Sequence, residues 1–276
     1  MEKVYRLFVI NPGSTSTRVA YYENDREVKG TKLVHPSQEI AKYRTINDQL
    51  PMRRQMVLDY MEEAGIHELD AIVSRGGGGR PIHCGGYAIT PLMAEECGRA
   101  PWPHASNLGV MISIDLMERF HVPGFIYDAP LADDFIDLAK VSGLPELPIQ
   151  RGAGHPLNEK AAGYRVAEKL GGKYSDYNFI ICHLGGGITV NAHAKGKIID
   201  SHINAFSPER AGALPMVAFT KKCFSGDWDY DTAFKRQMGG GGLVAYLGTS
   251  DVQEVERRID AGDKDADFYF DAMIYQ

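Results

Sequence analysis

The chain has 276 residues, 44% of them hydrophobic and 24% charged, which is enough to bury a large core in one or two domains. Its formal net charge of −6 argues against a general binder of nucleic acid or of an anionic membrane surface. No apolar run has the length of a membrane span or resembles a signal peptide, so we expect a cytoplasmic protein that binds no membrane. The four cysteines are scattered and show no metal-ligand spacing, so we expect them to be free thiols.

The first half of the chain predicts alternating strands and helices. Residues 4–10 and 17–23, rich in Val, Ile, Phe and Tyr, predict two strands joined by a turn of small, hydroxyl-bearing or amide residues. Hydrophobic spacing and glycine positions predict the later elements. These are a helix at 51–66, a strand at 69–75 that runs into four glycines, a helix at 105–120 with Ser106 or Asn107 as its cap, and a strand at 122–128.

The second half repeats this design. Its expected elements are a helix at 154–172 closed by a glycine pair, a strand at 178–182, a glycine turn at 185–187 and a strand at 188–193. Because each half contains a β-hairpin with a small, polar turn, we expect two related α/β domains that face one another across a cleft. We place their boundary near residue 149, which gives domains of residues 1–148 and 149–276.

The two hairpin turns are candidate anion sites. Residues 11–16 gather backbone N–H groups and hydroxyls without a bulky side chain, which suits an oxyanion such as phosphate. A polar hairpin tip without a ligand is the alternative. The second turn, in HLGGGIT (183–189), indicates a ligand more strongly, because three successive glycines weaken a strand and allow close backbone approach. Neither turn matches the P-loop pattern GxxxxGK[ST] or the dinucleotide pattern GxGxxG.

Seven segments along the chain carry a family resemblance. They are NPGSTSTRVA, SRGGGGRPI, HASNLG, SGLPE, HLGGGITVNAHAKGKIID, FSPERAGALP and GGLVAYLGTSD. Together they resemble the butyrate kinases, within the acetate and propionate kinase group of the actin-like ATPase superfamily. The resemblance implies two duplicated actin-like (ribonuclease H-like) α/β domains flanking a cleft. It also implies transfer of phosphate from ATP to a short-chain, butyrate-like carboxylate, giving an acyl phosphate and ADP.

The resemblance implies roles for three charged residues. Arg75, which ends a buried strand, matches the family's arginine at the carboxylate end of the cleft, and Arg210, in SPERAG, matches its second active-site arginine. Arginines suit this reaction because a carboxylate and a triphosphate must approach one another and their repulsion must be screened. A structural arginine is the alternative at both positions. Asp128, which ends FIYD, is assigned to Mg²⁺; capping of a helix that begins near Pro130 is its alternative role.

Three histidines also match family positions. His155, in GAGHPLN, matches the histidine that donates to the phosphoryl group in flight, whereas His104 and His183 match positions near the carboxylate and the phosphate. Each of them is a structural histidine in the alternative interpretation. The resemblance further implies a set of phosphate-binding residues in the two turns. They are Asn11, Ser14, Ser16 and Arg18 in the first turn and Gly185, Gly186 and Gly187 in the second.

The segment GTSDVQEVERRI (248–259) resembles the part of the family that carries an aspartate to the nucleotide ribose. Here that aspartate is Asp251, and a helix-capping role for Ser250 or Asp251 ahead of Glu254 is the alternative. The nearby glycines at 239–242 are interpreted either as a hinge for domain closure or as a loop.

The sequence also departs from the family pattern. Butyrate kinases continue beyond Gln276, so we expect the second domain to lack its C-terminal part and to expose apolar surface. Four glycines at 76–79 replace a bulkier family stretch and are expected to widen the acyl pocket in favour of four-carbon acids. The alternative function is a non-catalytic homologue that binds phosphate or nucleotide and acts through a partner chain. We expect a homo-oligomer, for example a dimer.

Overall fold

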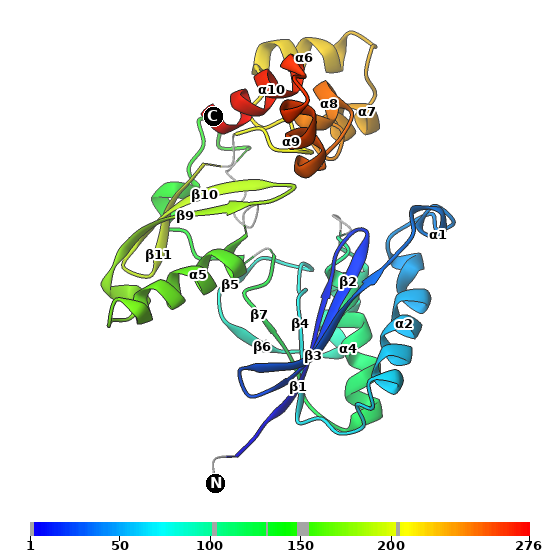
Figure 1. Ribbon diagram of the computed structural model, residues 1–276. Helices are drawn as coiled ribbons and strands as arrows, with labels where there is room; N and C mark the ends of the chain where they lie inside the picture. Colours follow the sequence, from blue (N-terminus) through cyan, green and yellow to red (C-terminus); the bar gives the residue numbers. More distant parts are fainter. Residues whose placement is uncertain (1–2, 101–103, 131, 148–154, 203–204) are drawn as a thin grey trace. The chain divides into compact units, whose positions relative to one another are not determined.

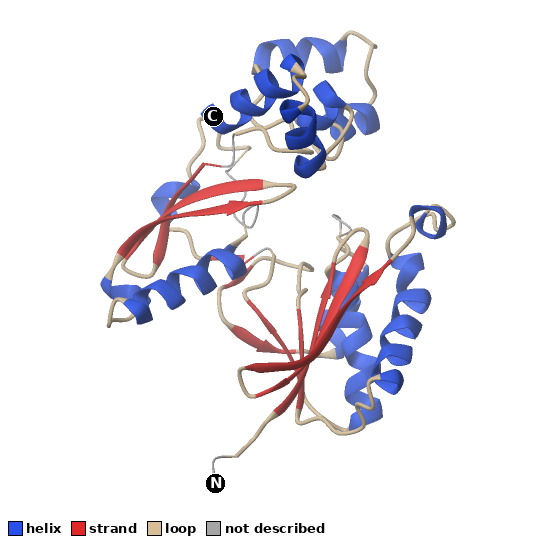
Figure 2. Ribbon diagram, viewed as in Figure 1, coloured by secondary structure: helices blue, strands red, loops and turns tan. Residues whose placement is uncertain are grey.

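The chain divides into two compact units, shown in Figure 1. The first unit comprises residues 1–134 and 150–157, and the second comprises residues 135–149 and 158–276. Both combine strands with helices (Figure 2), in agreement with the expected α/β class. This computed structural model describes residues 3–100, 104–130, 132–147, 155–202 and 205–276. The expected boundary at residue 149 lies outside the described residues and stays a prediction.

The first unit is built on a six-stranded sheet with the order β3-β2-β1-β4-β7-β6. Its strands are β1 (Arg6–Pro12), β2 (Ser16–Glu23), β3 (Arg26–Val34), β4 (Ala71–Ser74), β6 (Gly86–Ala88) and β7 (Gly124–Tyr127). β1, β4 and β7 run parallel to one another, whereas the other pairs are antiparallel. The carboxyl ends of β1, β4 and β7 therefore meet at one edge of the sheet, which is where open α/β sheets usually bind ligands.

Two long helices cover one face of this sheet. They are α2 (Leu50–Glu63) and α4 (Asn107–Phe120), which lie together beside the strands in Figure 1 and confirm two of the predicted helices. The buried residues between helices and sheet are Phe8, Ile10, Val19, Val57, Met61, Ile66, Leu69, Ile72, Leu108, Ile112 and Leu116. The smaller elements are α1 (Ser37–Ile40), the 3₁₀ turn η1 (Asn47–Gln49), α3 (Pro91–Gly98) and the paired strands β5 (Ile82–His83) and β8 (Ala132–Asp133).

The second unit combines a small sheet with a group of helices. The sheet has the order β11-β10-β9, with β9 (Asn178–Leu184), β10 (Ile188–Ala194) and β11 (Lys197–His202) in antiparallel pairs. The other elements are η2 (Asp137–Lys140), α5 (Pro156–Lys169), η3 (Tyr174–Asp176), α6 (Met216–Phe224), α7 (Tyr230–Gln237), α8 (Leu243–Leu247), α9 (Val252–Asp260) and α10 (Lys264–Tyr275). None of the described helices of either unit has the length and apolar character needed to cross a membrane.

Each predicted hairpin is present, and each carries a third strand that was not predicted. β3 has the sequence REVKGTKLV, and most of its residues are exposed, so it lacks a strong apolar alternation. It is a strand because it pairs with β2 along its length, and such pairing is a property of the tertiary context. β11 joins β10 in the same way, after a turn at Lys195 and Gly196.

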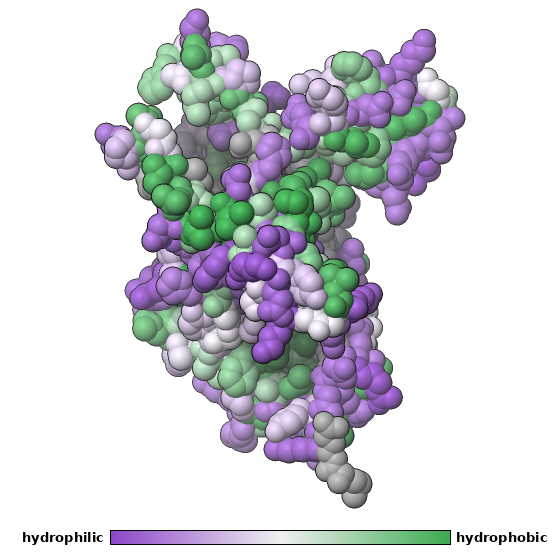
Figure 3. All heavy atoms as spheres, turned by 90° about the vertical axis from the view of Figure 1, so that its left-hand side faces the viewer, coloured by the Kyte–Doolittle hydropathy of each residue, from purple (hydrophilic) through white to green (hydrophobic). Residues whose placement is uncertain are grey.

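One side of β9 exposes apolar side chains. Along this strand the exposed and partly buried residues alternate, and Ile180 and Leu184 are 70% and 73% exposed. Figure 3 shows that the face of the molecule presented there carries apolar side chains, coloured green, among hydrophilic ones. The second unit therefore has exposed apolar side chains along this strand.

Candidate functional site

The carboxyl edge of the first sheet brings three predicted site residues together. Asn11 is the second-last residue of β1, β4 leads directly into Arg75, and β7 leads into Asp128. The register aligns Ile10 with Ser74, and the Arg75 N–H donates to the Ile10 carbonyl at 2.9 Å. Sequence alone placed each residue at a strand end, whereas the parallel strand order makes them neighbours.

The turn after β1 is closed by a hydrogen bond from the Gly13 N–H to the Ser16 carbonyl at 2.7 Å. Ser14 is exposed, and its N–H and that of Thr15 donate no hydrogen bond within the described structure. Two adjacent N–H groups of this kind form a concave site that suits an anion. The turn therefore has the donors that the sequence predicted for phosphate.

Asn11 and Arg18 lie opposite one another in the β1–β2 register, so their side chains project from the same face. Both are exposed, and an Arg18 Nη2 donates to Glu27 Oε1 at 2.9 Å. An exposed ion pair of this kind contributes little stability and exchanges readily with water. Arg18 can therefore leave Glu27 for a phosphate, and its predicted role in phosphate binding stays a prediction.

The sequence analysis did not identify Arg53, which holds this turn from the side of α2. Its Nη1 donates to the Gly13 carbonyl at 2.6 Å and its Nη2 to the Ser14 carbonyl at 2.8 Å. Only 1% of Arg53 is exposed. The sequence did contain a signal for its burial, because Arg53 lies four residues before Val57 and therefore on the same, buried side of the helix.

Arg75 is partly buried at the start of the glycine loop 76–79. Burial lowers the pKa of its guanidinium, which remains charged at neutral pH because the ordinary value is so high. A Cβ added at Gly78 would lie 2.9 Å from Asn107 Oδ1, and one added at Gly79 would lie 2.8 Å from the Cβ of Glu96. These glycines therefore allow close packing, and the free space that we expected beside an acyl group is not seen at these two positions.

Asp128 follows β7 in a left-handed backbone conformation, with φ at 42°, and only 2% of it is exposed. Its Oδ1 accepts the Gly85 N–H at 2.8 Å, and its own N–H donates to the Gly85 carbonyl at 3.0 Å. The alternative role as a helix cap is wrong, because the short strand β8 follows instead of a helix near Pro130. The carboxylate is thus oriented by the backbone at the carboxyl edge.

The first unit also contains His104 and His155. The Nδ1 of His104 accepts the Ser106 N–H at 3.1 Å and lies 2.7 Å from the Ser106 Oγ, so the neutral ring carries its proton on Nε2. This contact occupies Ser106, which stands at the N-cap of α4 without a side-chain cap bond; Asn107 instead accepts the Gly78 N–H at 3.1 Å. Of the two expected caps, Ser106 is therefore the N-cap residue, although its side chain makes no cap bond, and Asn107 is the first residue of the helix. His155 is partly buried immediately before α5.

In the second unit, the glycine turn contacts the SPERAG segment. A Cβ added at Gly187 would lie 2.7 Å from the Cζ of Arg210, so the guanidinium rests against the glycine backbone. The Ser207 Oγ donates to the Gly186 carbonyl at 2.7 Å, and this bond joins the segment to the turn. His183 stands at the end of β9, and its Nδ1 lies 2.9 Å from the Nδ2 of Asn158. The second unit therefore brings Arg210, His183 and the glycine turn together.

The glycines at 239–242 are packed against the same segment. The Gly239 N–H donates to the Glu209 carbonyl at 2.7 Å, and a Cβ added at Gly242 would lie 1.7 Å from the Ser207 carbonyl oxygen. Gly242 has φ at 61°, a conformation that favours glycine. These glycines therefore form a tightly packed turn before α8, and a hinge role has no support from these contacts.

Asp251 caps α9. Its Oδ1 accepts the N–H groups of Gln253 at 2.9 Å and Glu254 at 3.3 Å, as the capping alternative predicted. The side chain is exposed, so its predicted contact with a nucleotide ribose stays a prediction.

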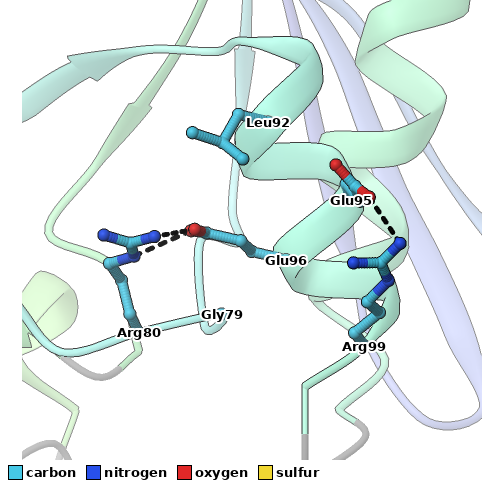
Figure 4. A pocket seen from close by; sticks show the side chains of 6 residues that line it. All are labelled: Gly79, Arg80, Leu92, Glu95, Glu96 and Arg99. Carbon is cyan, nitrogen blue, oxygen red and sulfur yellow. Dashed lines mark hydrogen bonds and ion pairs between the residues drawn. The ribbon is translucent and has the colours of Figure 1, made fainter.

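A groove of about 400 Å³ on the first unit contains none of the predicted site residues. Figure 4 shows that two ion pairs, Arg80 with Glu96 and Arg99 with Glu95, occupy it. The remaining lining residues are Gly79 and Leu92. Among the residues that the structure describes, no group of three or more His, Cys, Asp or Glu side chains could hold a metal ion.

Comparison with known proteins relates the whole chain to one group of enzymes. The chain is 41% identical over 281 residues to a probable butyrate kinase of Clostridium botulinum (strain Eklund 17B / Type B). This alignment covers 99% of the chain and 79% of the relative. A probable butyrate kinase of strain Alaska E43 is 40% identical with the same coverage. No family model matches the chain.

Solved structures show the same fold at low sequence identity. The acetate kinase of Porphyromonas gingivalis superposes with a TM-score of 0.74 at 17% identity, covering 98% of this chain and 77% of that one. A propionate kinase from Francisella tularensis subsp. tularensis SCHU S4 superposes with a TM-score of 0.73 and the same identity and coverage. The expected fold class, that of the acetate kinase group, is confirmed.

Proposed function

Because the chain belongs to the butyrate kinase family, we propose that it transfers the γ-phosphoryl group of ATP to a short-chain carboxylate. A carboxylate oxygen forms a bond to the γ-phosphorus while the bond from that phosphorus to the ADP oxygen breaks, which yields an acyl phosphate and ADP. This reaction brings two anions together, so it needs positioned cations and hydrogen-bond donors more than covalent chemistry from the protein.

The observation that carries the proposal is the carboxyl edge of the first sheet. There the anion turn after β1, the cation of Arg75 and the buried carboxylate of Asp128 follow three parallel neighbouring strands. Such a grouping offers donors for a phosphate, a cation for a second anion and an oxygen ligand for a metal. Phosphoryl transfer makes use of all three.

The residues present fit a nucleotide and Mg²⁺. Two outward N–H groups in the first turn and the Gly187–Arg210 contact in the second unit suit phosphate oxygens. Mg²⁺ prefers one or two carboxylates together with phosphate oxygens and water, and Asp128 supplies an oriented carboxylate. When bound, Mg²⁺ would neutralise charge on the phosphate oxygens. Asp128 would hold it directly or through water.

The remaining roles follow from position and charge. Arg75 would bind the carboxylate substrate with its planar fork, and the Nε2–H of His104 would donate to that substrate. Arg210 would stabilise charge on the transferred phosphoryl group, and His155 would donate to it. His183 would contact the phosphates near the glycine turn. These assignments combine the family resemblance with the contacts described above.

A hydroxamate assay tests the proposal. The purified chain is incubated with ATP, Mg²⁺ and hydroxylamine together with acetate, propionate, butyrate or isobutyrate, and acyl hydroxamate and ADP are measured. We expect both products, with the four-carbon acids preferred because the relatives are probable butyrate kinases. A folded chain that binds ATP yet forms no hydroxamate with any of the four acids would contradict the proposed activity. A homo-oligomeric state and a cytoplasmic location stay predictions.

A further inference from the structure

The environment of Arg53 is unusual for an arginine. The side chain comes from the first turn of α2 and is the largest fully buried side chain of the described residues. Besides the carbonyls of Gly13 and Ser14, it contacts Gln49 Oε1 through Nε at 3.0 Å and through Nη2 at 2.8 Å. Its Nη1 also lies 3.4 Å from Thr17 Oγ1. Each of these acceptors is a neutral oxygen, so the described contacts satisfy the guanidinium without a carboxylate.

The contacts of Arg53 determine which way the first turn faces. In a planar trans peptide the C=O and the following N–H point in opposite directions. Because Arg53 holds the carbonyls of Gly13 and Ser14 toward α2, the N–H groups of Ser14 and Thr15 point away from it. Those two N–H groups donate no hydrogen bond within the described part of the turn.

Among the residues that the structure describes, no carboxylate pairs with the guanidinium of Arg53. The neighbouring His35 places its Nε2 2.9 Å from Thr17 Oγ1. Burial, and then the charge of Arg53, lowers the pKa of His35 to about 4, so this ring is neutral at pH 7. A buried cation without a counter-charge is costly and is usually retained where an anion compensates it.

We propose that Arg53 is a positioning residue that orients the first turn for the polyphosphate of the nucleotide, and that the bound phosphate is the counter-charge for its guanidinium. The guanidinium lies behind the turn and reaches the anion only through the peptide groups that it orients. The charge and the orientation act in the same direction, since both favour an anion on the open side of the turn. The inference rests on the proposed function for the identity of the anion.

Binding of inorganic pyrophosphate, measured by calorimetry, tests the inference without turnover. In Arg53→Met we expect affinity to fall ~10- to 100-fold, the range for losing hydrogen bonds to a charged group. The matched control is Arg54→Met on the same helix, whose partly exposed guanidinium pairs with Asp115 at 2.8 Å. Its affinity should stay close to that of the unmodified chain.

Kinetics separates positioning from a merely structural role. In Arg53→Met the KM for ATP should rise while the KM for the carboxylate stays unchanged. In Arg53→Ala, guanidinium chloride at a non-denaturing concentration should restore part of the pyrophosphate affinity, whereas sodium chloride at equal ionic strength should not. Arg53→Lys keeps the charge and cannot bridge both carbonyls, so its affinity should be intermediate.

The outcomes distinguish this inference from the proposed function. If Arg53→Met does not fold, the pyrophosphate affinity of Arg53→Lys is compared with that of Arg54→Met instead. Folded Arg53 variants that bind pyrophosphate as tightly as Arg54→Met would overturn the inference even if the chain is an active kinase. Weakened pyrophosphate binding in a chain that forms no acyl phosphate would support the inference and contradict the proposed activity.

Discussion

Replacing Gly187 by alanine tests whether the glycine turn positions Arg210 for catalysis. An added Cβ would lie 2.7 Å from the Cζ and 2.8 Å from an Nη of Arg210, whereas ordinary contacts begin at 3.4 Å. The guanidinium must therefore move by roughly 0.7 Å, while the backbone of Gly187 can stay in place because its φ is not in the left-handed region. Displacing a catalytic group by about 1 Å can reduce the rate ~100-fold.

We therefore expect Gly187→Ala to lower kcat ~10- to 100-fold with little change in stability. The displaced atoms are the far end of a flexible side chain, and a glycine-to-alanine change at an unstrained φ alters stability by about 1 kcal/mol or less. The hydroxamate assay gives kcat, and thermal unfolding gives the melting temperature. Gly98→Ala is a suitable control, since its Cβ would lie 3.7 Å from Met111 Sδ.

A double-mutant cycle shows whether the effect passes through Arg210. If it does, Arg210→Lys should reduce the rate far less in the Gly187→Ala background than in the unmodified chain, because coupled residues are not additive. Two results would refute the reasoning. One is a kcat for Gly187→Ala equal to that of Gly98→Ala. The other is full additivity of the two changes, which would place the action of Gly187 elsewhere.

Three further changes test other parts of the site. Arg75→Lys should lower kcat ~100- to 1,000-fold at equal melting temperature, because lysine lacks the planar fork aimed at developing charge; a near-normal rate would remove Arg75 from the site. Asp128→Asn should abolish turnover or shift it to much higher Mg²⁺ concentrations while the fold persists, since asparagine also tolerates the left-handed backbone. Unchanged Mg²⁺ dependence would contradict the metal role. The pKa of His35 is lowered from 6.5 to about 4, so its contribution to stability is present above pH 6.5 and is lost as pH falls toward 4. Between these pH values, the free energy of unfolding measured with urea should fall more steeply with decreasing pH in the unmodified chain than in His35→Gln. Equal slopes of this free energy against pH in the two proteins would refute the assignment.

Local pattern was sufficient for the elements that carry the site. The two hairpins, the glycine turn and the long helices were all predictable because alternation, helical spacing and turn residues act over a few neighbouring positions. The same local information identified residues 11–16 and 185–187 as candidate anion sites. It could not identify β3, whose polar sequence becomes a strand only through its pairing with β2.

The sequence by itself determined the residue types that the chemistry requires, while the tertiary structure alone decided which of them are neighbours. Arg75 and Asp128 share an edge with the first turn because β1, β4 and β7 are parallel and adjacent, a fact of strand order between segments far apart in sequence. The same holds for Arg53, which is forty residues from Gly13 and contacts it only after α2 packs on the sheet. Asp128 accepts a hydrogen bond from the Gly85 N–H because the fold brings these two residues together, and sequence alone does not show which donors a buried carboxylate will meet.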